Sequence, residues 1–249
     1  MEVSLTTQML LEFIATLVLI LLGDGVCCCV SLNKSKGQGA GWVVITFAWG
    51  LAVWAGILIS GPWTGAHLNP AVTIALALQN PAAWPISRVL GYIVAQLAGA
   101  FLGAVLVYIF YKKHFDATDD ADTKLGVFCT GPAIRSYGSN FFSEMIGTFV
   151  LVFAIFATTV PGNEGLSNVG PLPISYIIVV IGMALGGTTG YAINPARDLG
   201  PRLAHAVLPI KGKRDSDWAY SWVPVVGPIV GGILAYVVYL GVYGELLAK

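Results

Sequence analysis

Two similar stretches decide how this chain folds: Gly65-Ala-His-Leu-Asn-Pro-Ala-Val-Thr73 and Gly190-Tyr-Ala-Ile-Asn-Pro-Ala-Arg-Asp198. In each, small or apolar residues lead into Asn-Pro-Ala and then into an apolar segment. Asparagine can cap a helix with its side-chain oxygen, and proline suits the first helical position. Because proline restricts the chain that precedes it, we expect Leu68 and Ile193 to be extended. Each stretch is predicted to be an extended arm that turns abruptly into a helix. We call them the first corner (residues 65–73) and the second corner (residues 190–198).

The composition indicates a membrane protein. Hydrophobic residues make up 56% of the chain and charged residues only 10%, whereas soluble domains contain about 25% charged residues. The 13 basic and 13 acidic residues balance, which argues against a nucleic-acid partner. Three of the four cysteines are consecutive, which suits neither a metal site nor a disulfide set. We therefore predict no metal and no cofactor, and interpret the cysteines as small buried residues: Cys27, Cys28, Cys29 and Cys129.

Six apolar stretches are long enough to cross about 30 Å of hydrocarbon as helices. They are residues 9–31, 42–60, 86–111, 141–161, 172–185 and 218–242, and we expect the fifth to continue to Gly187. Two more apolar segments, residues 69–79 and 194–208, are about half a span long, which favours re-entrant helices. The predicted fold is an all-α membrane protein with six transmembrane helices and two re-entrant half-helices.

The two halves of the chain repeat each other. Besides the corners, the matching elements are Glu12-Phe-Ile-Ala-Thr16 with Glu144-Met-Ile-Gly-Thr148, and Gly99 and Gly103 with Gly227 and Gly231. A repeat with three crossings places its second copy upside down, and such inverted repeats commonly build a pathway at the membrane midplane. We expect a single channel domain over residues 1–249, with repeats at residues 8–111 and 141–243 joined by a solvent-exposed loop at residues 112–140. The corners should then meet near the bilayer centre.

The corners have the chemistry of a pore lining. Irregular backbone at membrane depth is tolerated where it is buried in protein or faces a water-filled cavity. We expect each arm to present carbonyl acceptors to a permeant molecule, from Gly65, Ala66, His67, Leu68, Gly190, Ala192 and Ile193. Asn69 and Asn194 would cap their helices through oxygen and leave the amide NH2 groups to donate into the lumen. Two helix N-termini facing the centre would repel cations but not neutral molecules.

The paired corners and the segment Asn194-Pro-Ala-Arg-Asp-Leu-Gly-Pro-Arg202 resemble the aquaporin family, the major intrinsic proteins. The resemblance runs from Glu12 to about Tyr236. It implies the aquaporin-like arrangement of six helices and two half-helices, a pore in each subunit, a homotetramer and a cytoplasmic N-terminus. It also marks the paired motif residues as Asn69, Pro70, Ala71, Asn194, Pro195 and Ala196.

The basic residues oppose that orientation. With a cytoplasmic N-terminus, the inside would hold Arg88 and Lys249. The outside would hold nine basic residues: Lys34, Lys36, Lys112, Lys113, Lys124, Arg135, Lys211, Lys213 and Arg214. The positive-inside bias alone predicts the opposite topology. We follow the family resemblance and expect a multi-pass cell-membrane protein with both termini in the cytoplasm.

Within the family, the chain resembles the glycerol-conducting branch. That resemblance implies a selectivity filter of Trp49, Gly182, Tyr191 and Arg197. Trp49 and Tyr191 would form an apolar corner for the carbon chain of a polyol. Arg197 would donate hydrogen bonds to its hydroxyls and repel cations. In the branch that this chain resembles, phenylalanine is commonest at the position of Tyr191. The extra hydroxyl of Tyr191 therefore bears on the relative permeation rates of glycerol and water.

Other side chains are expected to support this site. Glu12 and Glu144 could complement helix dipoles, but the repeat and the resemblance favour acceptance of hydrogen bonds from the arms. Asp198 and Arg202, four residues apart, are expected to form a structural pair. Trp42 is interpreted as a membrane-interface anchor.

We predict a passive channel for glycerol and similar small neutral solutes, with water, that excludes ions and protons. A coupled secondary transporter is the alternative, but it needs ionisable residues within the spans. Few occur beyond Glu12, Asp24 and Glu144, which we place near span ends. An enzyme is not indicated because no nucleophile or metalloprotease motif is present. A purely structural junction would leave the filter residues unused. The expected partners are glycerol, water, similar solutes and the lipid bilayer.

Overall fold

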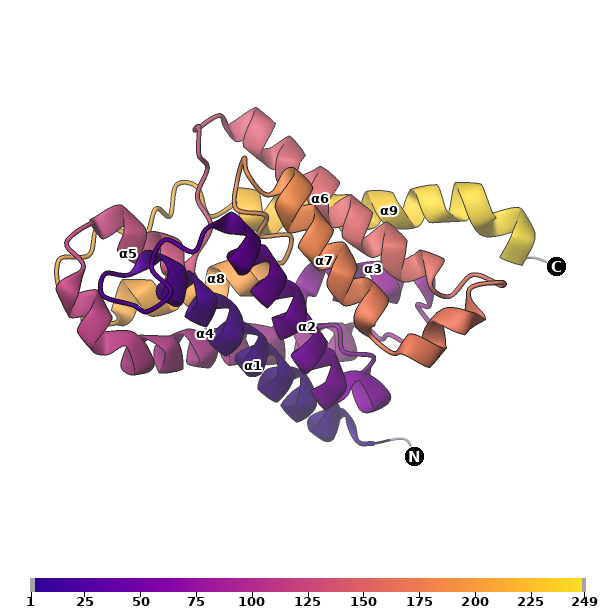
Figure 1. Cartoon of the computed structure of the whole chain (residues 1–249). Coiled ribbons are helices and arrows are strands. Elements are labelled where there is room, and N and C mark those ends of the chain that lie inside the picture. The colour runs from indigo at the N-terminus through magenta and orange to yellow at the C-terminus, as the bar shows by residue number, and fades with distance from the viewer. Residues whose placement is uncertain (1–2, 248–249) are drawn as a thin grey trace.

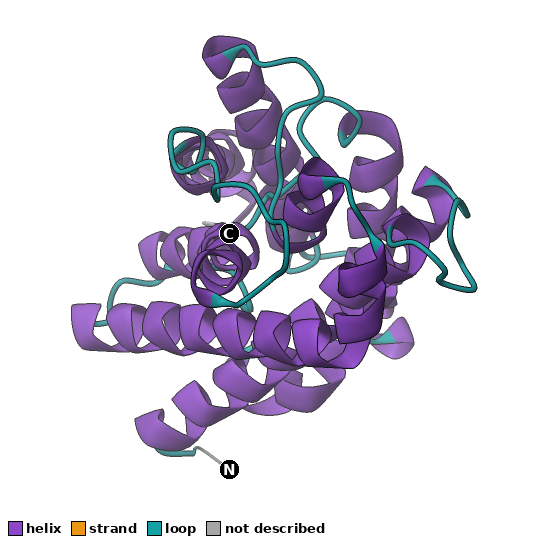
Figure 2. Ribbon diagram, turned by 90° about the vertical axis from the view of Figure 1, so that its left-hand side faces the viewer, coloured by secondary structure: helices purple, strands orange, loops and turns teal. Residues whose placement is uncertain are grey.

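The computed structural model describes residues 3–247, so Lys249, counted above, lies outside the described residues. Within this range the chain forms helices and loops and no strand (Figure 2). Five of these helices are long and apolar enough to cross a membrane: α1 (Leu5–Ser31), α2 (Trp42–Thr64), α4 (Ile86–Ala117), α6 (Tyr137–Ala157) and α9 (Val223–Leu247). The fifth predicted crossing is α7 (Leu172–Leu185), a shorter apolar helix that follows the 3-10 turn η1 (Glu164–Val169).

The half-helices α3 (Pro70–Gln79) and α8 (Pro195–Val207) begin at the two Asn-Pro pairs. In Figure 1 the start of α1 and the end of α9 both lie toward the right, whereas α5 (Ala121–Phe128) lies at the left end. The half-helix α8 lies toward the α5 end of the molecule, and α3 lies toward the end that holds the termini (Figure 1). The two half-helices therefore approach the middle from opposite ends, as an inverted repeat requires.

Helix boundaries differ from the predicted ones chiefly at turns. The last helix begins at Val223 rather than at residue 218, because Asp217 has a positive φ of 49° and the next residues form turns. The fifth crossing ends at Leu185 rather than at Gly187, because the chain turns there toward the second arm.

The expectation of a loop at residues 112–140 is wrong for most of this stretch, since only residues 118–120 and 129–136 lie outside helices. Helix α4 continues to Ala117, and α5 follows with Asp120 as its N-cap. Asp120 accepts hydrogen bonds from the Thr123 hydroxyl and from the backbone N–H of Asp122, which lower the pKa of its carboxyl group. Leu125, Val127 and Phe128 of α5 are buried, and the helix packs against α1 and α8. The run of aspartates that suggested a loop contains a helix-capping residue.

Glycines bring helices of each half into close contact. A side chain at Gly99 of α4 would place its Cβ 2.3 Å from the Phe13 carbonyl oxygen of α1. In the second half, a Cβ at Gly231 of α9 would lie 2.2 Å from the Met145 carbonyl oxygen of α6. Both helix pairs therefore depend on glycine at the crossing point, as is common in membrane helices.

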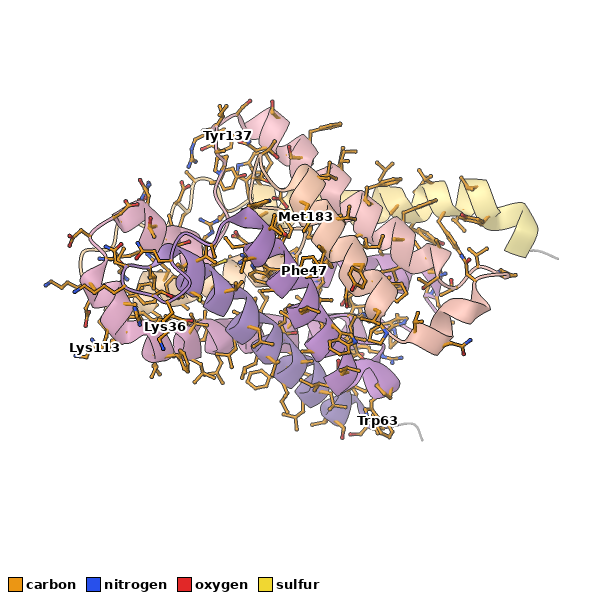
Figure 3. All side chains as sticks on the ribbon, in the orientation of Figure 1. Lys36, Phe47, Trp63, Lys113, Tyr137 and Met183 are labelled. Atoms are coloured by element: carbon orange, nitrogen blue, oxygen red, sulfur yellow. The ribbon has the colours of Figure 1, made fainter. Side chains whose placement is uncertain are left out.

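The flank of the molecule is apolar and its ends are polar. Phe47 and Met183 lie on the outer flank of α2 and α7, whereas Lys36 and Lys113 lie at the α5 end (Figure 3). Trp63 lies at the opposite end of α2 (Figure 3). Large apolar side chains cover much of the flank, Phe47 being 41% exposed. Such a surface suits hydrocarbon, in which the backbone of each helix is satisfied internally.

Candidate functional site

The two corners bond to each other at the centre of the molecule. Asn69 Nδ2 donates to the Ile193 carbonyl oxygen at 2.8 Å, and Asn194 Nδ2 donates to the Leu68 carbonyl oxygen at 2.8 Å. Each asparagine also caps its own helix, because its Oδ1 accepts the N–H two residues later at 2.9 Å. The amide groups are therefore not wholly free for the lumen, as the sequence suggested. One N–H of each amide joins the corners, and one is left to donate.

The arms are not extended at Leu68 and Ile193, so this prediction is wrong. Proline restricts the residue directly before it, and the extended residues are Asn69 (φ −156°) and Asn194 (φ −155°). Both arms instead have positive φ angles at three matching residues: Gly65 80°, Ala66 50°, Leu68 53°, Gly190 83°, Tyr191 40° and Ile193 42°. Such conformations are strained for residues other than glycine and persist only where the surroundings impose them.

Two buried glutamates impose this backbone. Glu12 on α1 accepts the N–H of His67 at 3.0 Å and that of Leu68 at 2.8 Å. Glu144 on α6 accepts the N–H of Ala192 at 3.0 Å and that of Ile193 at 2.8 Å. Both predicted support residues thus lie against the arms and hold two consecutive N–H groups each.

Two cavities follow one another along the corners. The inner cavity, of about 70 Å³, is lined by both arms and by apolar residues of α1, α2, α6 and α7. The outer cavity, of about 390 Å³, opens beside α5. The residues common to both linings are Trp49, Gly190, Tyr191 and Arg197. These residues mark the junction of the cavities. Of the residues predicted to contribute pore-lining carbonyls, Gly65 is the one that lines neither cavity.

Three of the four predicted filter residues lie at this junction, and Gly182 does not. Gly182 lines neither cavity. A Cβ at this position would lie 2.7 Å from Tyr191 Cζ and 2.7 Å from Thr46 Cγ2. The missing side chain thus makes room for the tyrosine ring rather than directly for a solute. The Tyr191 hydroxyl is buried and has no hydrogen-bond partner among the described residues.

Arg197 is held in place by an aromatic ring and by two oxygen atoms. Its guanidinium carbon lies 4.1 Å above the Trp49 ring, within cation–π distance. Its Nη1 donates to the Phe128 carbonyl oxygen at 3.1 Å and to Asp24 Oδ1 at 3.4 Å. Both bonds leave from Nη1, so the other N–H groups of this side chain are available to a solute.

Sequence reasoning placed Asp24 near a span end and missed its contact with Arg197. The side chain of Asp24 is fully buried. The sequence feature that could have indicated this contact is an acidic residue within an apolar helix, because such a residue normally has a partner inside the protein.

Trp42 also has a contact that its interpretation as an interface anchor did not include. Its Nε1 donates to the Gly182 carbonyl oxygen at 2.8 Å, and its ring meets Tyr191 edge to face with centroids 5.7 Å apart. Trp42 lines the outer cavity. It therefore braces the ring of Tyr191 from the outer side.

The Asp198–Arg202 pair ties the second corner to the loop before α6. Arg202 Nε donates to Asp198 Oδ1 at 2.8 Å, and neither side chain is exposed. Asp198 Oδ2 accepts the N–H of Thr130 at 2.8 Å, and Arg202 Nη2 donates to the Thr130 carbonyl oxygen at 2.9 Å. Thr130 lies two residues beyond Phe128, so this pair also positions the carbonyl that holds Arg197.

Residues 3–247 contain no cluster of three or more His, Cys, Asp or Glu side chains that could hold a metal ion. The four cysteines are all unbridged, and Cys27, Cys28 and Cys129 are buried.

The family is decided by comparison with known proteins. The model of the family described as major intrinsic protein matches residues 1–239. This chain belongs to the major intrinsic protein family. A probable glycerol uptake facilitator protein of Thermotoga maritima is 55% identical over 92% of this chain and 97% of its own length. Glycerol uptake facilitator protein 3 of Lactiplantibacillus plantarum is 52% identical over 96% of this chain and 98% of its own length.

A solved structure of similar fold is the aquaglyceroporin of Plasmodium falciparum. It has a TM-score of 0.83 and 33% sequence identity, with 98% of this chain and 99% of that chain covered. The aquaporin-like fold and the multi-pass membrane character of this major intrinsic protein follow from these matches together with its apolar helices.

Proposed function

We propose that this major intrinsic protein is a passive channel for glycerol and other small uncharged solutes, which also conducts water and excludes ions and protons. The observation that carries the proposal is the junction between the two cavities. There Trp49 and Tyr191 provide two aromatic surfaces, and Arg197 provides hydrogen-bond donors. A polyol has an apolar carbon edge and a hydroxyl edge, and these surfaces match both.

The proposed filter is Trp49, Gly182, Tyr191 and Arg197, with Gly182 acting through the space it leaves for the tyrosine ring. Inside the filter, arm carbonyls would accept hydrogen bonds from solute hydroxyls. The remaining amide N–H groups of Asn69 and Asn194 would donate to them. A neutral solute thereby exchanges its water contacts for fixed partners, whereas an ion loses its hydration shell without equivalent replacement.

Ion and proton exclusion would arise at two places, the filter and the point where the two half-helices meet. The N-termini of α3 and α8 meet where Asn69 and Asn194 cap them, so both helix dipoles place partial positive charge at the centre. Single-file water there would orient its oxygen toward the asparagine amides, which interrupts a continuous chain of water donors and acceptors.

The buried acidic groups favour a passive channel over a coupled transporter. Glu12 and Glu144 are engaged by backbone N–H groups, and Asp198 is engaged by Arg202. A coupled transporter needs carboxylates that bind and release a proton or an ion during the cycle. Membership of a channel family likewise argues against an enzyme.

We further propose a homotetramer in the cell membrane, with a pore in each subunit and both termini cytoplasmic. Figure 1 supports the placement of both termini on one side of the membrane. The α5 end, with the outer cavity and most of the basic residues, would then face outward. Accessibility labelling of a cysteine introduced at Lys113 would test this orientation.

Stopped-flow light scattering on purified protein in liposomes tests the solute range. We expect glycerol and water to equilibrate faster than in protein-free liposomes, and a five-carbon polyol to be slower than glycerol. Glycerol flux equal to that of protein-free liposomes, with folded protein present, would reject the proposed function.

A further inference from the structure

Asp24 is a buried acid to which the proposed function above assigns no role. It lies on α1 and has no exposed surface. Its Oδ1 faces Arg197 Nη1 at 3.4 Å, and its Oδ2 is buried without a hydrogen-bond partner in the described part of the chain. A buried carboxylate with one unsatisfied oxygen is destabilising on its own. Its pairing with a residue of the cavity junction therefore points to a role in that junction.

Gly23, the residue before Asp24, contacts the Trp49 ring on which the Arg197 guanidinium lies. A Cβ at Gly23 would lie 2.3 Å from the Trp49 ring, so this ring packs directly on the backbone of α1. Arg197 lies 4.1 Å above that ring. Two consecutive residues of α1 thus support the filter from behind: Gly23 seats the indole, and Asp24 holds the guanidinium lying on it.

Arg197 has few other partners that could fix its position. The carbonyl oxygen of Phe128, at 3.1 Å, is neutral and belongs to the end of α5. Asp24 is the carboxylate paired with Arg197 among the described residues. Because arginine keeps its charge in proteins, removal of the Asp24 charge would leave a buried cation with neutral acceptors only.

We propose that Asp24 is a positioning residue of the filter, which holds the Arg197 guanidinium against the Trp49 ring and so sets the preference for glycerol over water. This inference rests on the proposed glycerol channel and on the proposed role of Arg197 in its filter. Without Asp24, the guanidinium gains hydration by turning into the junction of the cavities. That movement obstructs glycerol more than the smaller water molecule.

The test is the ratio of glycerol to water permeability in proteoliposomes, each normalised to folded channel. We expect Asp24→Asn, which keeps the size of the side chain and removes its charge, to lower the ratio by roughly tenfold, the factor for one charge-assisted hydrogen bond. A purely structural role would reduce the number of folded channels and lower both fluxes together, leaving the ratio unchanged.

Thr16→Val is the matched control. Thr16 also lies on α1, is fully buried and has an Oγ1 without a partner among the described residues. It lines neither cavity. The replacement is similar in size and also removes a polar group from the interior, so the wild-type ratio is expected.

A second pair of variants covers the case in which Asp24→Asn does not fold. If Asp24 acts through Arg197, then Arg197→Ala and the Asp24→Asn, Arg197→Ala double variant share one permeability ratio, since nothing remains to be positioned. Different ratios in this pair would overturn the inference.

The remaining outcomes separate the two proposals. Wild-type glycerol flux together with an unchanged ratio in Asp24→Asn would overturn the inference alone. Absence of glycerol flux through the wild-type protein would overturn the proposed function and the inference with it.

Discussion

The two corners have the same backbone but present different side chains to the pathway. Both have positive φ angles at three matching arm residues, and in both a glutamate accepts two backbone N–H groups. At matching positions, however, the first corner has Ala66 and Val72, whereas the second has Tyr191 and Arg197. All four residues line the inner cavity. Backbone geometry is thus repeated in both halves, while the aromatic ring and the cation occur in one corner.

The support of the two corners differs as well. At the first corner, Gln96 Nε2 donates to Glu12 Oε2 at 2.9 Å and to Thr73 Oγ1 at 3.0 Å. At the second corner, the residue matching Thr73 is Asp198, which forms the buried ion pair with Arg202. The first corner is thus supported by hydrogen bonds without a side-chain ion pair. The second corner, which carries the proposed filter, adds an ion pair that anchors the loop before α6.

The largest expected effect is the loss of this ion pair. Arg202→Met should lower the free energy of unfolding by about 3–5 kcal/mol, because Asp198 stays buried without its cation. Thermal unfolding in detergent measures it. Lys112→Met is the control, since Lys112 and Asp116 have the same spacing but lie exposed, and exposed pairs contribute about 0–1 kcal/mol. Equal effects of both substitutions would show that the second corner gains nothing from its ion pair.

Removal of either glutamate is expected to have an effect of similar size. Glu12→Ala and Glu144→Ala each leave two buried N–H groups unpartnered. Each unpartnered group should lower the free energy of unfolding by about 1–3 kcal/mol. We expect Glu12→Ala to be more destabilising, because Gln96 and Thr64 also donate to this carboxylate. The same thermal unfolding assay, with Glu12→Gln as the conservative control, checks the order. A smaller effect at Glu12 than at Glu144 would contradict the described support of the first corner.

A filter whose side chains are small and uncharged, like Ala66 and Val72 of the first corner, should lose selectivity among solutes. The Tyr191→Ala, Arg197→Ala double variant replaces the ring and the cation with small side chains. We expect the permeability of a five-carbon polyol relative to glycerol to rise by about tenfold, equivalent to about 1.4 kcal/mol. Val72→Ala in the first corner is the control and should leave the ranking unchanged. Wild-type ranking in the double variant would place solute selection elsewhere.

The smallest effect is expected from Tyr191→Phe. The Tyr191 hydroxyl is buried without a hydrogen-bond partner in the described part of the chain, so its removal should raise the free energy of unfolding by about 1 kcal/mol. The ring would remain over Gly182, and the ratio of glycerol to water flux should not change. A changed ratio would mean that the hydroxyl reaches the solute.

Much of this fold could be predicted because its signals are local or repeated. Asn-Pro marks the start of each half-helix, and the matching Glu12 and Glu144 indicated a common role. The arm conformation could not be predicted, because positive φ at Leu68 and Ile193 depends on N–H bonds to glutamates far away in the sequence. The contact of Asp24 with Arg197 joins residues 173 positions apart. The position of Gly182 behind Tyr191 depends equally on tertiary packing.

Passive conduction of glycerol is tested most directly by measuring glycerol movement through the wild-type protein in liposomes that carry no ion or proton gradient. Glycerol is expected to equilibrate fast, at the same rate inward and outward, and this rate is expected to stay unchanged when protonophores and ionophores are added. Glycerol flux that requires a gradient, or that stops when the gradient is dissipated, would contradict it.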